Sequence, residues 1–125
     1  MEKTIKTQAE LDELTEIKDG DRITIDSAGL RLNHRIGADG GVLIIMGDMR
    51  CGLAGVISTY GESKPELHIF GTSTPVIITR DDSKPVIYTQ DESQPVIYTH
   101  DESKSTIYTC DTSTPERISN FISKN

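Results

Sequence analysis

Residues Glu62 to Pro115 read ESKPELHIFG TSTPVIITRD DSKPVIYTQD ESQPVIYTHD ESKSTIYTCD TSTP, a tandem repeat with a ten-residue period. Self-similarity at a fixed period is typical of stacked architectures, in which neighbouring units complete each other's core. This stretch therefore predicts a stacked, repetitive fold.

Each repeat carries a short strand pattern. One column is always aliphatic: Leu67, Ile77, Ile87, Ile97 and Ile107. Two residues further on lie Ile69, Thr79, Thr89, Thr99 and Thr109. Strand side chains alternate between faces, and the columns in between accept Glu, His and Thr at the ends of the array. We therefore predict that the Ile and Thr columns point inward, although the opposite facing stays open. The Val column and an outward ladder of Tyr88, Tyr98 and Tyr108 would then face out.

One strand and one turn do not close a coil, but two repeats do. The sequence predicts an all-β fold, a β-solenoid (β-helix) of decapeptide repeats, with a coil of about twenty residues and two strands. Each residue would then stack on the one twenty positions away, Tyr88 on Tyr108 and Ile78 on Tyr98. The rival fold is an antiparallel meander, which would gain nothing from identical columns. Strict repetition favours the solenoid.

We expect a single domain with a short helix capping each end. Thr7 and Glu10 fit a capping box, which indicates a helix over residues 7–17. Ser113, Thr114, Pro115 and Glu116 read as the start of a second helix. The expected divisions of domain 1–125 are a helical cap at 1–20, irregular coils at 21–61, regular repeats at 62–115 and a helical cap at 116–125.

Charge and composition narrow the classes of partner. The chain has 125 residues and a net charge of −7, which argues against direct binding to nucleic acid or to an anionic membrane and leaves basic proteins open. Cys51 and Cys110 are too few for a disulfide framework, and the first residues show no apolar signal region. A cytoplasmic location is expected.

Acidic residues recur in the turns of the repeat: Asp81, Asp82, Asp91, Glu92, Asp101, Glu102 and Asp111. They are interpreted as a solvated edge, with Lys84 and Lys104 as partial counter-charges, or as a surface that faces a protein partner. Calcium binding is a weaker alternative, because calcium-binding β-rolls carry glycine-rich turns and these turns lack glycine. We expect neither a metal nor any other cofactor.

No catalytic set stands out in the sequence. His34, His68 and His100 lack metal-ligand spacing, and no nucleophile has a base and an orienting group beside it. We therefore expect a protein that is not an enzyme.

The repeat resembles bacterial and phage proteins with short tandem β-repeats, a resemblance of repeat style only. It rests on Glu62-Ser63-Lys64-Pro65, on DSKPVIYT at 82–89 and on ESQPVIYT at 92–99. The resemblance implies a structural or binding role. We expect an acidic solenoid, comparable to a nucleic-acid mimic, that binds a basic protein which handles nucleic acid, as phage inhibitors of host defence do. The alternative is a self-assembling structural protein, with homo-oligomers formed through the end caps.

Overall fold

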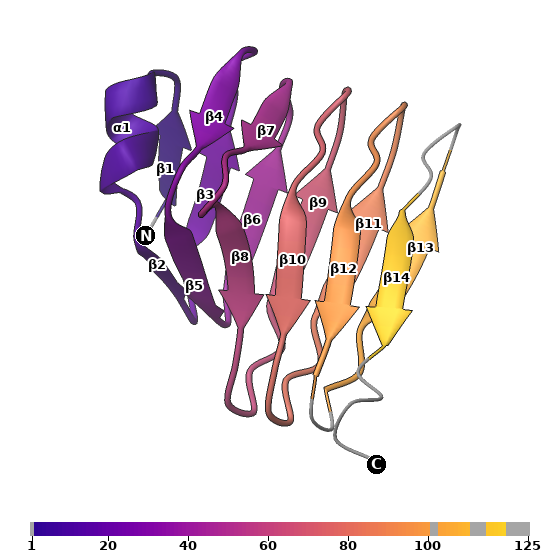
Figure 1. Ribbon diagram of the computed structural model, residues 1–125. Helices are drawn as coiled ribbons and strands as arrows, with labels where there is room; N and C mark the ends of the chain where they lie inside the picture. The colour runs from indigo at the N-terminus through magenta and orange to yellow at the C-terminus, as the bar shows by residue number, and fades with distance from the viewer. Residues whose placement is uncertain (1, 101–102, 111–114, 120–125) are drawn as a thin grey trace.

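The chain winds into a solenoid built almost entirely of β-strands (Figure 1). A computed structural model describes residues 2–100, 103–110 and 115–119. Two six-stranded sheets face each other across a narrow core, and every pairing between their strands is parallel. The predicted β-solenoid is therefore confirmed. The antiparallel meander is wrong, because successive repeats alternate between the two sheets.

The two large sheets contain most of the strands. Sheet A holds, in spatial order, β1 (Glu2–Ile5), β3 (Arg22–Ile25), β6 (Val42–Ile45), β9 (Glu66–Ile69), β11 (Val86–Thr89) and β13 (Thr106–Thr109). Sheet B holds β2 (Glu16–Lys18), β5 (Arg35–Asp39), β8 (Val56–Thr59), β10 (Val76–Thr79), β12 (Val96–Thr99) and β14 (Glu116–Ser119). A third side, present only in the early coils, is formed by β4 (Leu30–Leu32) and β7 (Met49–Cys51).

Strand register in the repeat region has the expected offset of twenty residues. Tyr88 pairs with Tyr108, and Ile78 pairs with Tyr98. Earlier coils are less regular, since Val42 pairs with Glu66 and the chain between them makes the extra strand β7.

The Ile and Thr columns point inward, as predicted. Ile77, Ile87 and Ile97 are fully buried, and so are Thr79 and Thr89. On the outer faces Tyr98 is 36% exposed and Tyr108 is 54% exposed, so the opposite facing is wrong. Backbone ladders and this narrow aliphatic column together hold the coils.

The core also contains buried hydroxyl groups at its corners. Thr59 Oγ1 lies 2.9 Å from Ser83 Oγ, and Thr79 Oγ1 lies 2.8 Å from Ser103 Oγ. Each pair joins one coil to the next. Buried hydroxyls without a partner are costly, so these bonds allow polar side chains inside the coil.

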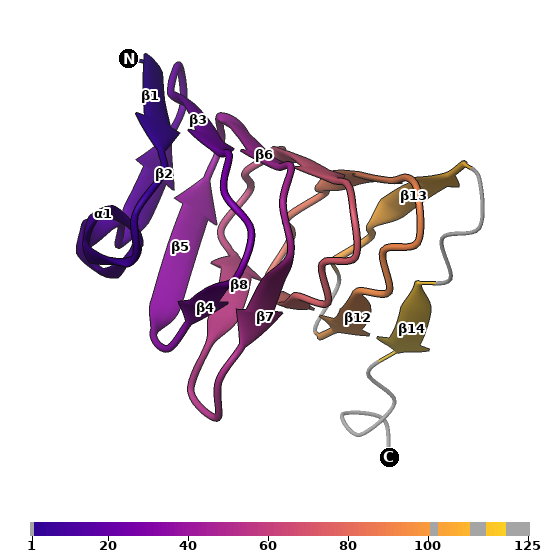
Figure 2. The same ribbon diagram turned by 90° about the horizontal axis from the view of Figure 1, so that it is seen from above.

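A helix forms near the N-terminus, but it is shorter than predicted. Helix α1 (Gln8–Glu13) has the expected capping box, in which the side chain of Thr7 accepts from the Glu10 amide. The Gln8 side chain bonds the backbone of Arg31 in β4 through both its oxygen and its nitrogen. Figure 2 shows α1 in the first coil beside β2. The helix thus covers the edge of β4, and no strand in the described part of the chain pairs with the outer edges of β1 and β2.

The predicted C-terminal helix is wrong where the structure describes the tail. Residues Glu116–Ser119 form strand β14, which pairs in parallel with β12. The residues read as a helix start are also the Ser-x-Pro turn of the repeat, and the next four residues keep its phase, with Ser119 beside Thr99. Pairing with an existing sheet edge outweighed the local helix signals. The remainder of the expected cap, residues 120–125, lies outside the described residues.

Candidate interaction surfaces

The turns of the solenoid form two edges. We name as the lower edge the turns that lead from sheet B to sheet A, residues 19–21, 39–41, 60–65 and 80–85. The upper edge is made by the turns that leave sheet A, residues 26–29, 46–48, 70–75 and 90–95 (Figure 1). Asp81 and Asp82 lie on the lower edge. Asp91 and Glu92 lie on the upper edge, so the predicted acidic set is divided.

The lower edge carries a carboxylate in each of these four turns. Asp19, Asp39 and Glu62, from three successive coils, line one shallow hollow together with Lys64. Asp81 and Asp82 follow in the next coil, and all five acids are exposed. Sequence reasoning missed Asp19 and Asp39 because they precede the repeat. Their place next to a glycine at the end of a strand is the signal that could have found them.

Asp81 and Asp91 have a structural role in addition to their charge, because their side chains bond the backbone of a neighbouring turn. Both adopt a left-handed backbone, with φ of 57° and 59°. Their carboxylates accept hydrogen bonds at 3.0 Å from the amides of Gly61 and Gly71, one coil away. Asp tolerates this conformation better than most residues, because its short side chain bonds nearby backbone. These two acids therefore help to hold successive turns together.

Among the turns named above, only those of the lower edge contain lysines. Lys64 and Lys84 stack there, since the Lys84 amide donates to the carbonyl of Ser63 in the coil beneath. Thr74 and Gln94 occupy the equivalent positions on the upper edge. The lower edge is thus patterned, with an acidic column beside a basic column. This pattern differs from the plain line of negative charge expected from the sequence.

The acidic residues of the upper edge do not form a continuous line. Its turn at residues 70–75 contains no acid. Glu92 lines a hollow with Arg50, Thr72, Thr74 and Gln94. The guanidinium of Arg50 also lies 3.5 Å from Asp48, so cations of the third side offset these acids.

An aromatic ladder runs over the outer face of sheet A. His68 stacks on Tyr88 with ring centroids 4.5 Å apart, and Tyr88 stacks on Tyr108 at 5.1 Å. Tyr98 lies on sheet B beside Ile78, so the predicted ladder of three tyrosines is divided between faces. The stacked rings cover each other's faces and leave their edges for solvent. Such a ladder resembles packing more than a platform for bases or sugars.

The described residues contain no group of three His, Cys, Asp or Glu side chains arranged to hold a metal ion. Cys51 and Cys110 are free thiols, and burial raises the pKa of Cys51. The hydrogen bond from Tyr60 to Glu16 raises the pKa of Tyr60 to about 12.

Three of the predicted site residues, Asp101, Glu102 and Asp111, lie outside the described residues. In the described part of the chain, no helix has the length and apolar character needed to cross a membrane. Comparisons of the chain with family models, with curated proteins and with solved structures found no match. The function must therefore be argued from the surfaces themselves.

Proposed function

We propose that this protein is a non-catalytic binding protein and that its lower edge contacts a basic protein partner. The observation that carries the proposal is the unbroken line of exposed carboxylates formed by Asp19, Asp39, Glu62, Asp81 and Asp82. Adjacent coils of a parallel solenoid rise by roughly 4.8 Å, so like charges repeat at short intervals. Like charges stacked in this way oppose folding, and a cationic partner relieves that repulsion.

The lysine column limits the kind of partner. A simple mimic of nucleic acid would offer negative charge only, but Lys64 and Lys84 lie beside the acids. The partner therefore needs basic groups opposite the acidic column and neutral or acidic groups opposite the lysines. Charge patterns of this kind contribute mainly to specificity and to the rate of association. Proteins that handle nucleic acid in bacterial or phage systems, a class suggested by the style of the repeat, remain our leading candidates.

Matched variants separate the two edges. Glu62→Gln with Asp82→Asn removes two lower-edge charges, and Asp26→Asn with Glu92→Gln removes two upper-edge charges. None of the four positions bears one of the carboxylate bonds between coils that Asp81 and Asp91 make. The immobilised proteins would be exposed to bacterial lysate at roughly 50 and 500 mM salt, a range over which screening changes strongly.

We expect proteins captured at low salt to be released at high salt, and to be lost from the lower-edge variant but kept by the upper-edge variant. Capture that ignores salt and both pairs of substitutions would refute the proposal and move the contact surface to the aromatic ladder.

Self-assembly is the second candidate function. It is favoured by the end strands of both large sheets, β1 and β2 at one end and β13 and β14 at the other, which among the described residues pair with a neighbouring strand on one side only. An assembler forms concentration-dependent oligomers on its own, whereas a binding protein stays monomeric until its partner is added. Sedimentation velocity of the purified chain over a wide concentration range distinguishes the two.

A further inference from the structure

The ends of the solenoid are complementary to each other. Strand β1 is the first strand of sheet A and β13 is the last described one, and every strand between them runs parallel. An exposed strand edge presents free N–H and C=O groups, which are a template for another strand. A second copy translated along the solenoid axis would bring its β13 against β1 in the same parallel geometry that joins all the coils.

One residue breaks this complementarity. Lys3 pairs with Ile23, and the column continues through Leu43, Leu67, Ile87 and Ile107. The four residues from Ile23 to Ile87 are at most 1% exposed, so this column is the centre of the core. Glu2 and Thr4 are exposed on the outer face, whereas Lys3 between them is half-buried. By register and by alternation, Lys3 is a charge on the inward face.

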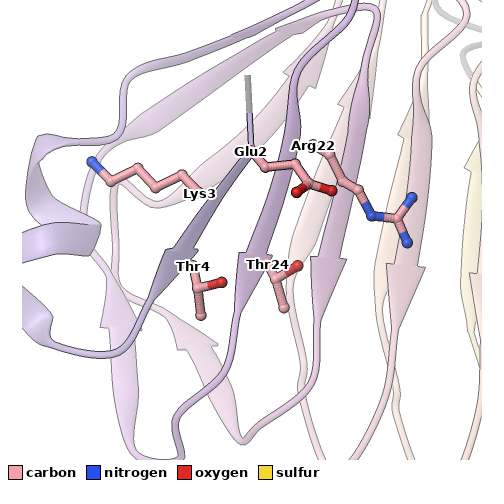
Figure 3. A pocket seen from close by; sticks show the side chains of 5 residues that line it. All are labelled: Glu2, Lys3, Thr4, Arg22 and Thr24. Atoms are coloured by element: carbon pink, nitrogen blue, oxygen red, sulfur yellow. The ribbon is translucent and has the colours of Figure 1, made fainter.

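The Lys3 side chain avoids burial by leaving through the open end. Figure 3 shows it extending away from Glu2 and Arg22, which lie on the outer face. Its charge reaches α1: the pKa of Glu10 is lowered mainly by the hydrogen bond from the Lys6 amide, and the charge of Lys3 contributes to the same direction. A coil stacked on β1 would close this exit.

The opposite end offers an apolar position in the same column. Ile107 is only partly buried, and it packs against the core cluster from the last described strand of sheet A. In a head-to-tail contact, Ile107 of one copy would lie next to Lys3 of the other. An ammonium group without a partner would then be enclosed, which is strongly unfavourable.

We propose that the inward-pointing charge of Lys3 prevents the β1 end of one molecule from pairing with the β13 end of a second copy. Because of this charge, the outer edge of β1 can stay without a partner strand and the protein does not grow into a filament. Inward-pointing charges on edge strands are a known means of blocking such pairing. A binding protein needs this protection, because its parallel coils would otherwise extend from one molecule to the next.

The test is Lys3→Ile, compared with Lys6→Ile, which removes the same charge from an exposed position outside the column. We expect Lys3→Ile to shift the sedimentation coefficient upward with concentration, while the wild type and Lys6→Ile keep a single monomeric species. A second variant, Lys3→Ile with Ile107→Lys, places a charge at the other end of the column. It should return the protein to the monomer.

Circular dichroism would verify that each variant keeps its β-structure. The proposal is overturned if Lys3→Ile stays monomeric at every concentration, if Lys6→Ile associates equally, or if Ile107→Lys fails to reverse the association. It is also overturned if the wild type already forms oligomers, a result that would favour self-assembly as the function.

Discussion

Two serines in equivalent positions of the repeat have different surroundings. Ser83 and Ser93 are both fully buried. Ser83 Oγ bonds Thr59 Oγ1 and donates to the carbonyl of Arg80 at 2.7 Å, whereas Ser93 Oγ has no hydrogen-bond partner. The residue 24 positions earlier also differs between the two: it is Thr59 for Ser83 but Ile69 for Ser93. Each serine reaches across a corner to the preceding coil, and only one of them finds a hydroxyl there.

Alanine substitutions at these two serines should therefore change the free energy of unfolding by different amounts. Ser83→Ala removes two hydrogen bonds and leaves the Thr59 hydroxyl buried alone, so we expect a loss of about 1–3 kcal/mol of unfolding free energy. Ser93→Ala removes a buried hydroxyl that bonds nothing, so stability should be unchanged or slightly higher. Urea denaturation of both variants measures the difference. Equal losses would show that Ser93 is hydrogen-bonded after all.

At the scale of elements, the capping box of α1 makes stability depend on pH. Amides of Lys6 and Thr7 donate to the Glu10 carboxylate, and the first of these bonds is the main reason that the pKa of Glu10 lies below its ordinary value of 4.5. A lowered folded-state pKa stabilises the protein fully above the ordinary value. That contribution is lost as the pH falls through the lowered value.

Glu10→Gln tests this dependence, because Gln keeps the shape and the hydrogen-bonding oxygen but not the charge. We expect the variant to melt below the wild type at pH 7 and the gap to be smaller at pH 3, because the Glu10 carboxylate loses its charge as the pH falls through its lowered pKa. Thermal melts at the two pH values measure the gap. A gap of the same size at both would assign the effect to packing.

The two ends show what sequence reasoning could and could not reach. The capping box of Thr7 and Glu10 was readable because it is local. The prediction for the tail was wrong, because the sequence Ser113, Thr114 and Pro115 fits a helix start and a repeat turn equally well. Only the edge of β12, which is offered by the tertiary structure, decides for strand β14. The bond between Gln8 and Arg31, 23 residues apart, gave no sequence signal at all.

At the scale of the whole molecule, the period predicted the coils but not the pattern of the edges. Repeats alternate between sheets, so Lys64 and Lys84 share the lower edge, while Asp91 and Glu92 lie opposite them on the upper edge. The repeat period alone left open whether the acids lie along one edge or two, because that depends on how the turns alternate between the sheets. Asp19 and Asp39 join the lower edge only once the early, irregular coils are in place.

The central claim is that neighbours in space are twenty residues apart in the sequence, and engineered disulfides test it most directly. In a variant with Cys51→Ala and Cys110→Ser, the pair Val86→Cys and Thr106→Cys lies on adjacent parallel strands. Strands roughly 4.8 Å apart allow a disulfide. The control pair, Val86→Cys and Val96→Cys, lies on opposite sheets.

Mass spectrometry after mild oxidation, with free thiols alkylated, reads out both pairs. The solenoid predicts an intramolecular disulfide between positions 86 and 106 and free thiols at 86 and 96. A disulfide between 86 and 96, with free thiols at 86 and 106, would contradict the coil and would place consecutive repeats side by side.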